Sequence, residues 1–471
     1  MPTNTSLSLL LVLDSPPEST ASPALLNHYL CDFIDKLSDL VELSLYYPLF
    51  SHSDEFYSLS VTEDGNITRF VTFIPPRLHT LEESVVNEKL DDIFTYILKE
   101  KSFDLVHIIS LKNHSFNYPQ IAKERRLPVV LTISDFFTRT PLLFADTQKS
   151  LKISNFISSP FYAVISRIER FFSKEDALAY WWYEQVGRYS TFYNKTPAKS
   201  ESVIQFLEHR QKKVEEMLSM VDIVHFFSKS LYTGRYFSMI EEDDTLFIEQ
   251  GIDVDAASQS RPFEINGPVS FGFVGDIIPE EGIEILISAM NLLSDQGRHN
   301  SLHIYGDVFQ NKEYYNKLQR MSRSKHIHFH GPVAPQRLAA ILDTFDVLVV
   351  PSEWQRSDTY LLYTTIARRK AVITSYRSSI GEIVRKTGRG MTLEETTPEA
   401  LFSAMIELET NRKKLYYHMR ITDDFSFVDV GETVELFVSN YKKIVATPPE
   451  EAALLAQKRF RKRVERLREG R

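Results

Sequence analysis

The fold is decided by the stretch Phe271-Gly-Phe-Val-Gly-Asp-Ile-Ile-Pro-Glu-Glu-Gly-Ile283, which is followed by apolar positions across Leu286–Leu293. Its first part, within Val269–Val274, is a short apolar run of the kind that forms a buried strand. The segment Gly282–Leu293 has apolar residues at helical spacing. Strand, turn and helix together predict the opening unit of a parallel α/β sheet.

The same alternation of strand and helix continues in both directions along the chain. Downstream it predicts strand Leu302–Tyr305, helix Lys312–Met321, strand Ile327–Phe329, helix Pro335–Thr344, strand Val347–Val350 and helix Thr359–Arg368. Upstream it predicts strand Leu9–Leu13, helix Ala24–Leu40, strand Val41–Tyr46, a hairpin Tyr57–Phe73 that turns at Asp64-Gly65, helix Glu82–Lys99, and strands Leu105–Ile109, Val129–Ile133 and Ile223–Phe227. We therefore expect two doubly wound, Rossmann-like α/β domains.

Composition excludes several classes of protein. The 471 residues carry a net charge of −9, with 43% hydrophobic and 25% charged side chains, so we expect a globular chain with no nucleic-acid partner. The single cysteine, Cys31, excludes a disulfide framework and a cysteine zinc cluster. The early apolar run Leu7–Leu13 lacks a basic flank and a cleavage site, and no run reaches the ~20 apolar residues that span a bilayer. The expected location is cytoplasmic.

Two segments interrupt the alternation. Residues 138–215 are rich in aromatic side chains, including Trp181 and Trp182. Because loops of this length without secondary structure are uncommon in compact domains, we predict a helical insertion. This insertion is either the core of an added subdomain or a surface that faces an acceptor or a membrane. The tail Lys458–Arg471 is a predicted basic amphipathic helix. Three roles are open for this helix: contact with an anionic membrane, packing on the parent domain and, less favoured in an acidic chain, nucleic-acid binding.

The second half resembles the donor-binding domain of retaining, GT-B-fold glycosyltransferases of glycosyltransferase family 4. The blocks that carry the resemblance are, in order, Phe271–Ile283, Leu302-His-Ile-Tyr-Gly-Asp307, His328-Phe-His-Gly-Pro-Val333, Asp346–Ser352, Trp354–Thr365, Ala371–Thr374 and Gly381–Val384. Fainter matches in the first half are Asp104–His107, Val130–Asp135 and Val221–Val224 with Ser228, and Phe425–Tyr441 resembles the crossover helix. The resemblance implies two Rossmann-like domains that face a cleft.

The resemblance also implies a division of the chain. Residues 1–262 are the expected N-terminal acceptor domain, which carries the aromatic-rich helical insertion. Residues 263–424 are the expected donor-binding domain. Residues 425–447 are the expected crossover helix back to the first domain, and 448–471 the basic amphipathic tail.

A nucleotide-sugar site is implied at the family's ligand-binding positions. In this chain they are Gly275, Asp276, Glu281, Gly306, Val333, Asp358, Thr359, Tyr360, Leu361 and Thr364. The amides of Asp358–Leu361, at a predicted helix N-terminus, are expected to hold a phosphate through the helix dipole. Arg356 is the candidate catalytic cation. Asp135 is the second candidate catalytic residue, because it follows a strand at the edge where open sheets bind ligands, and Ser134 stands where the family often has a histidine.

The charged positions of this chain differ from the family pattern. The loop after the first strand, Ser15–Pro23, has no glycine, whereas the family has a glycine pair there. Asp276 and Glu281 replace the arginine and lysine that neutralise the donor diphosphate. Arg356 and Thr364 replace the two glutamates of the E-x7-E motif. Two unit charges ~5 Å apart interact by roughly 3 kcal/mol at an effective dielectric of ~20, so we expect weak binding of common UDP- or GDP-sugars.

Two hypotheses of function follow from the resemblance. The first is a retaining, hexosyltransferase-like glycosyltransferase that moves a sugar from a nucleotide-sugar donor to a cell-surface glycan or lipid-linked acceptor, without a cofactor. The alternative is a catalytically degenerate homologue that acts as a non-enzymatic protein partner or scaffold in glycan synthesis, protein glycosylation or secretion. In either case, a tail that contacts an anionic membrane would place the chain peripherally on the inner face of that membrane, whereas a tail that packs on the parent domain would not.

Two further patterns suggest metal ligands but favour other interpretations. His326, His328 and His330 alternate along a predicted strand and would project from one face. Ligands two residues apart on a flat strand rarely converge, so the pattern favours a solvated face over a metal site. Asp253-Val-Asp255 matches a metal-binding D-x-D motif but lies in the expected interdomain segment, which favours a linker. We therefore predict no metal.

Overall fold

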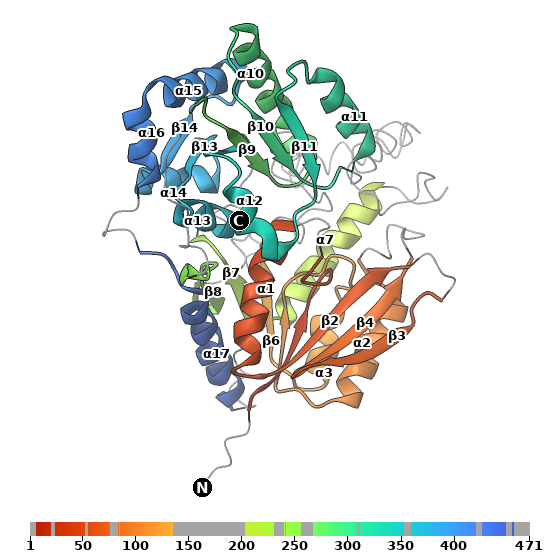
Figure 1. Ribbon diagram of the computed structural model, residues 1–471. Coiled ribbons are helices and arrows are strands. Elements are labelled where there is room, and N and C mark those ends of the chain that lie inside the picture. The colour runs from red at the N-terminus through yellow and green to blue at the C-terminus, as the bar shows by residue number, and fades with distance from the viewer. Residues whose placement is uncertain are drawn as a thin grey trace, which may run out of the picture. The chain divides into compact units, whose positions relative to one another are not determined.

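The computed structural model describes residues 6–19, 24–51, 55–75, 83, 85–134, 203–229, 240, 242–255, 267–308, 311–352, 359–420, 426–448 and 455 (Figure 1). The chain forms two compact units. The first unit consists of Met1–Pro16, Leu37–Ile248 and Glu435–Arg471, and the second of Pro17–Lys36 and Glu249–Val434.

The first unit is built on an eight-stranded sheet with the order β3-β4-β2-β1-β5-β6-β7-β8. The strands are β1 (Ser8–Val12), β2 (Glu42–Phe50), β3 (Leu59–Asp64), β4 (Ile67–Ile74), β5 (Leu105–Ile108), β6 (Val129–Ile133), β7 (Ile223–Phe226) and β8 (Thr245–Phe247). All neighbouring pairs are parallel except β3 with β4, which form the predicted hairpin around Gly65. The strand order reverses at β1, so the topological switch point lies between β1 and β5.

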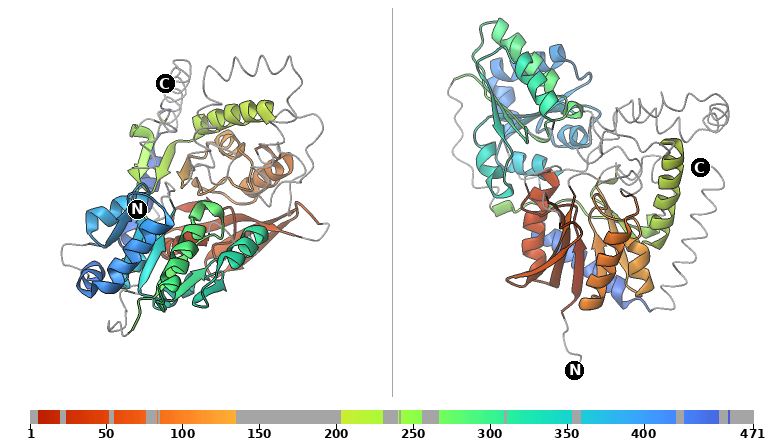
Figure 2. Two further views of the ribbon diagram at one scale, coloured as in Figure 1. Left: turned by 90° about the horizontal axis from the view of Figure 1, so that it is seen from above. Right: turned by 90° about the vertical axis from the view of Figure 1, so that its right-hand side faces the viewer.

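The helices of the first unit follow from their apolar faces. They are α2 (Glu88–Glu100), α3 (Tyr118–Glu124), α7 (Val203–Met220) and the part of α17 (Val430–Ala446) from Glu435 onward. Buried residues of α2, α3 and α7 share one core with the strands, and these helices lie on one side of the sheet (Figure 2). Every residue of β5 and β6 is buried, which explains why both strands are mainly apolar, with His107 and Thr132 as the polar exceptions.

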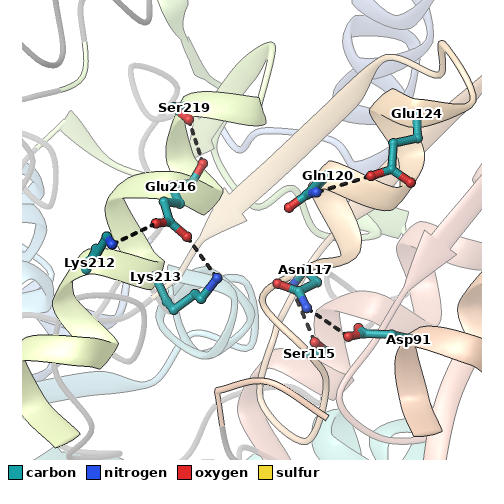
Figure 3. A network of polar contacts seen from close by, with 9 residues as sticks. All are labelled: Asp91, Ser115, Asn117, Gln120, Glu124, Lys212, Lys213, Glu216 and Ser219. Atoms are coloured by element: carbon teal, nitrogen blue, oxygen red, sulfur yellow. Dashed lines mark hydrogen bonds and ion pairs between the residues drawn. The ribbon is translucent and has the colours of Figure 1, made fainter. Parts of the chain in front are cut away.

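Polar contacts join α2 to the start of α3 (Figure 3). Asn117 donates from Nδ2 to Oδ2 of Asp91 over 2.8 Å, and its backbone N–H donates to Oγ of Ser115 over 3.3 Å. On α7, Lys213 and Glu216 form an ion pair at 2.9 Å. These contacts link or brace helices and include no residue that the sequence assigns to ligand binding.

The second unit has a six-stranded, fully parallel sheet with the order β11-β10-β9-β12-β13-β14. Its strands are β9 (Phe271–Val274), β10 (Leu302–Tyr305), β11 (Ile327–Gly331), β12 (Val347–Val350), β13 (Ala371–Ser375) and β14 (Gly390–Leu393). Its helices are α10 (Ile283–Asp295), α11 (Lys312–Met321), α12 (Leu338–Leu342), α13 (Thr359–Ala367), α14 (Ser379–Thr387), α15 (Pro398–Thr410) and α16 (Arg412–Met419), and α1 (Ala24–Ser38) belongs to this unit up to Lys36. This is the strand order of a doubly wound sheet, and the predicted fold class is confirmed.

Close packing explains the glycine within the first strand of this sheet. A Cβ atom on Gly272 would lie 2.2 Å from Cδ1 of Phe345, so the ring occupies the space of a side chain. On the opposite face, Phe271 and Phe273 belong to the core formed with α10 and α15. The strand is therefore covered on both faces although one of its four residues has no side chain.

Several predicted boundaries shift for local reasons. The predicted helix Glu82–Lys99 begins only at Glu88, because the side chain of Asn87 caps it by accepting from the backbone N–H of Leu90 over 3.3 Å. The predicted helix Pro335–Thr344 is a 3-10 turn, Pro335–Arg337, followed by the short α12. The predicted crossover helix begins at Val430 and ends at Ala446.

Two predicted segments fall largely outside the described residues. Of the insertion 138–215, only the part from residue 203 onward is described, and it belongs to α7. The tail Lys458–Arg471 is not among the described residues. Among the helices that the structure describes, none combines the length and apolar content needed to cross a bilayer.

Candidate functional site

The carboxyl edge of the second sheet brings two glycine-containing strand ends together. Gly275 donates its N–H to the carbonyl of Tyr305 over 3.1 Å, and Gly306 donates to the carbonyl of Gly331 over 2.9 Å. A Cβ atom on Gly306 would lie 2.1 Å from the carbonyl oxygen of Gly275. Gly306 therefore allows the backbone at Gly275 to approach closely, at the edge where open α/β sheets bind their ligands.

Asp276 and Glu281 lie in the loop between β9 and α10 and are 6% and 1% exposed. The loop is closed by a 3-10 turn, Pro279–Glu281, and by Gly282 at φ 70°. Neither residue is without an interaction partner. The reversed charges expected from the sequence are therefore buried components of this loop.

The N-terminus of α13 is capped by a glutamine that the sequence did not single out. Oε1 of Gln250 accepts from the backbone N–H of Thr359 over 2.8 Å and from that of Tyr360 over 3.1 Å. Gln250 is fully buried, and all nine residues of α13 are buried too. Two of the amides that we expected to hold a phosphate thus donate to this side chain.

Acidic side chains accept hydrogen bonds from the tyrosines of α13. Tyr360 donates to Oδ2 of Asp32 on α1 over 2.5 Å, and Tyr363 donates to Oε2 of Glu249 over 3.0 Å. Burial, followed by the neighbouring carboxylate, raises the pKa of both tyrosines. Burial also raises the pKa of Asp32. This surrounding disfavours an additional negative charge.

Two more predicted ligand positions make internal hydrogen bonds. The hydroxyl of Thr364 donates to the carbonyl of Tyr360 over 2.8 Å within α13. The carbonyl of Val333 accepts from Nε2 of His28 on α1 over 3.2 Å. The second unit therefore places α1 against positions that the sequence assigned to the nucleotide.

The structure brings some of the predicted site residues together, while others lie outside the described residues. Gly275, Asp276 and Gly306 share one edge of the sheet, and Thr359, Tyr360, Leu361 and Thr364 share α13. Asp135, Arg356 and Asp358 lie outside the described residues. The overlooked Gln250 precedes Gly251, where a Cβ atom would lie 2.6 Å from the carbonyl oxygen of Asp429. That glycine, in a Gln-Gly-Ile sequence before a predicted linker, was the available signal.

The first unit carries a second polar group at its switch point. Asp14 lies two residues after the end of β1 and is 6% exposed. It accepts from the hydroxyls of Ser15 over 3.2 Å and Ser110 over 3.3 Å. Burial raises the pKa of this carboxyl, against the opposing charge of Lys112. The sequence placed its candidate at Asp135 instead and missed Asp14, because a carboxylate after a strand is common.

The histidines of β11 form a partly solvated face. His328 and His330 are exposed while Ile327 and Phe329 are half-buried, and His326 lies just before the strand. Within the part of the chain that the structure describes, no three His, Cys, Asp or Glu side chains are grouped so as to hold a metal ion.

The chain is similar in sequence to known glycosyltransferases. Residues 268–411 match the family model described as "Glycosyl transferases group 1". The chain is 20% identical over 405 residues to an uncharacterized glycosyltransferase of Methanocaldococcus jannaschii, covering 84% of this chain and 93% of that protein.

Solved structures resemble the whole chain at low identity. Sucrose-phosphate synthase from Thermosynechococcus elongatus has a TM-score of 0.58 at 14% identity, covering 93% of this chain and 96% of its own. HepE of Anabaena, in complex with UDP and glucose, has a TM-score of 0.58 at 13% identity, covering 93% and 99%. The second unit thus carries a region similar to group 1 glycosyl transferases, and the chain has the fold of two parallel-sheet α/β domains, GT-B, that these solved structures share.

Proposed function

We propose that this chain is a retaining glycosyltransferase of family 4 that transfers a sugar from a nucleotide-sugar donor to a glycan or lipid-linked acceptor. The observation that carries the proposal is the match of residues 268–411 to the group 1 model, over the same sheet in which Gly275 and Gly306 approach closely. Backbone at the carboxyl edge of a parallel sheet, next to helix N-termini, is suited to a diphosphate. The HepE structure with UDP and glucose supports a nucleotide sugar as the donor.

The departing nucleoside diphosphate needs stabilisation, because negative charge develops on it during transfer. In the proposed site the partial positive charge at the N-terminus of α13 supplies part of it. The buried carboxylates Asp276 and Glu281 oppose it, so we propose a low affinity for UDP- and GDP-sugars.

Neutralising the two carboxylates tests this charge effect without enlarging either side chain. Since both are buried, Asp276→Asn with Glu281→Gln is preferable to substitution by arginine and lysine. The double variant is expected to bind UDP more tightly than the native chain, more so at low salt than at high salt. Weaker binding by a folded double variant would mean that the carboxylates belong to a working donor site.

A second candidate is a catalytically degenerate homologue that acts as a partner protein in glycan synthesis or secretion. The observation that favours it is that predicted ligand positions are satisfied internally: the amides of Thr359 and Tyr360 by Gln250, and the hydroxyl of Thr364 by its own helix. A site that saturates its own donors has less to offer a ligand.

Titration calorimetry against UDP, GDP and their common sugar conjugates separates the two candidates. Micromolar binding of one nucleotide sugar, followed by its hydrolysis or transfer with retained anomeric configuration, supports the transferase. Absence of binding across the panel, by a protein whose circular dichroism shows it to be folded, favours the partner protein.

A further inference from the structure

Gln250 has one satisfied end and one unsatisfied end. Its Oε1 accepts two backbone N–H groups of α13, with the hydroxyl of Thr359 a further 3.5 Å contact. Its Nε2 meets no hydrogen-bond acceptor among the residues that the structure describes, although the residue is fully buried. A buried polar group without a partner costs about 1–3 kcal/mol, so a residue in this state calls for an explanation.

The orientation of the amide is fixed by chemistry. Two N–H donors, from Thr359 and Tyr360, face one atom of the carboxamide, and only its oxygen can accept them. If the NH2 group and the oxygen exchanged places, the NH2 group would face the backbone N–H groups of Thr359 and Tyr360, and none of these donors would have an acceptor. It remains directed away from the two amides of α13.

The bonds at the oxygen strengthen the donor at the nitrogen. Hydrogen bonds through a conjugated amide polarise one another, so an Oε1 that accepts twice leaves the Nε2 hydrogens more positive. The first amides of a helix also carry the positive end of its dipole. Gln250 thus extends the electropositive end of α13 by one neutral side chain.

The neighbouring acids do not use this donor. Oδ2 of Asp32 accepts from Tyr360, and Oε2 of Glu249, the residue next to Gln250, accepts from Tyr363. Nε2 of Gln250 is therefore a neutral N–H donor that an anion could use, although the nearby ionisable side chains, Asp32 and Glu249, are acidic.

We propose that Gln250 is a donor-positioning residue that holds a phosphate oxygen of the nucleotide sugar through Nε2 while Oε1 remains on the amides of Thr359 and Tyr360. The proposal deepens the glycosyltransferase function and rests on it. The ligand is a nucleoside diphosphate group, which contacts α13 through Gln250 instead of through these two amides.

The substitution Gln250→Glu separates the two ends of the side chain. A carboxylate at this position still caps α13, and a negative charge at a helix N-terminus is favourable, so the helix retains its cap. The variant loses the N–H donor and places an anionic oxygen against the phosphate. We expect a Kd for UDP that is at least tenfold higher than that of the native chain. Because the variant adds a buried carboxylate to a surrounding that already holds those of Asp32 and Glu249, circular dichroism must show that it is folded.

Tyr363→Phe is the matched control on the same helix. It removes one hydroxyl, the donor to Glu249, and leaves Gln250 and both capped amides in place. Its Kd for UDP is expected to stay within about twofold of the native value, well below the tenfold change expected for Gln250→Glu. Pyrophosphate, titrated in parallel, distinguishes recognition of a free diphosphate from that of the nucleotide.

The outcomes of the calorimetry are distinct. Loss of UDP binding in folded Gln250→Glu with retention in Tyr363→Phe supports the proposal. Equal binding by Gln250→Glu and the native chain overturns it while leaving the transferase intact. No binding of any nucleotide by the native chain overturns the transferase itself. If Gln250→Glu weakens the binding of pyrophosphate as much as that of UDP, Gln250 contacts the diphosphate. If it weakens the binding of UDP but not of pyrophosphate, the proposed contact with a phosphate oxygen is wrong.

A measurement on the native protein covers the case in which Gln250→Glu fails to fold. Selective 15N labelling of glutamine side chains reports Nε2–H2 directly, and a new bond to a phosphate oxygen shifts its protons downfield. A glutamine side-chain signal that moves at saturating UDP, and that is missing in Gln250→Met, supports the proposal. An unchanged set of glutamine signals at saturation overturns it.

Discussion

Both sheets carry histidines on parallel strands, but the two groups of histidines differ in what surrounds them. In the first unit, His107 on β5 and His225 on β7 are fully buried beside Phe437 of α17. In the second unit, His303 on β10 is half-buried and His330 on β11 is exposed. The two groups of histidines therefore differ in how far their rings are removed from water.

The buried histidines form a hydrogen-bonded chain with a single direction. Nε2 of His225 lies 3.0 Å from the carbonyl of Ile248, which can only accept, so this nitrogen carries the hydrogen. Nδ1 of His225 then accepts from the hydroxyl of Thr132 at 2.9 Å, and that hydroxyl accepts from Nε2 of His107 at 2.8 Å. Nδ1 of His107 accepts from Tyr441 at 2.6 Å. One carbonyl thus fixes both neutral tautomers and ties α17 to β5, β6 and β7.

The histidines of the second sheet form a stack at the sheet edge. Nδ1 of His303 and Nε2 of His330 are 3.0 Å apart, and the ring of His330 stacks on Tyr305 with centroids 4.4 Å apart. His328 lies on the other side of His303, with centroids 5.3 Å apart. His330 is exposed, so this cluster is partly solvated, whereas the histidines of the first sheet are fully buried.

Acid is expected to distinguish the two regions most strongly. Burial, and then the charge of His225, holds the pKa of His107 well below its usual range, and burial lowers that of His225 to about 4. A histidine whose pKa is lower in the folded state stabilises the fold fully above its unfolded pKa of about 6.5 and loses that contribution as pH falls toward 4. For His225 alone this loss is on the order of 3 kcal/mol.

Hydrogen exchange between pH 7 and 4 measures this effect locally. Corrected for intrinsic exchange, the opening free energy of amides in β5 to β7 should fall across this interval. The change in β10 and β11 should be smaller, because His303, whose pKa is also lowered to about 4, is only half-buried and solvent screens its charge. Equal losses in both sheets would contradict the assignment of burial as the cause.

Thr132→Val is the largest expected single-residue effect. Valine fills the same space but leaves Nε2–H of His107 and Nδ1 of His225 without partners in a buried site. We expect a loss of about 2–4 kcal/mol in the unfolding free energy of the first unit, since each unsatisfied buried group costs about 1–3 kcal/mol. Urea denaturation followed by circular dichroism checks it, and Thr132→Ser, which keeps the hydroxyl, is the control.

Tyr441→Phe removes only the terminal donor of the same chain. Nδ1 of His107 then lacks its partner, while the remaining bonds persist. The expected loss is about 1–2 kcal/mol, together with faster hydrogen exchange in α17. A loss as large as that of Thr132→Val would show that the hydroxyl serves more than His107.

His330→Ala is expected to have the smallest effect on stability, and it tests the partly solvated histidines of β10 and β11. The pKa of His303 is lowered to about 4 by burial and then by His330 and His328, so removing His330 should move it upward toward 6.5. The unfolding free energy should change by less than about 0.5 kcal/mol, as for most surface substitutions. Titration of the His303 ring protons by NMR measures the pKa, and a value that stays near 4 would contradict this account.

Much of the fold follows from the sequence alone. Strands such as Val129–Ile133 and Val347–Val350, and helix Lys312–Met321, agree with the observed bounds to the residue. Strands buried on both faces are continuously apolar and helices alternate with them, so local pattern is sufficient for the doubly wound fold class. The resemblance of the second half to group 1 glycosyl transferases likewise depends on short blocks along the chain.

The tertiary structure alone decided which polar groups meet. Gln250 caps Thr359 across 109 positions of the chain, and Tyr441 reaches His107 across 334. Hydrophobic periodicity reports only which face of an element is buried, whereas hydrogen-bond partners depend on which elements the sheet order places side by side. Buried donors and acceptors must find partners wherever the packing provides them, which is why the sequence could propose positions for a candidate site but not which of its polar atoms have partners.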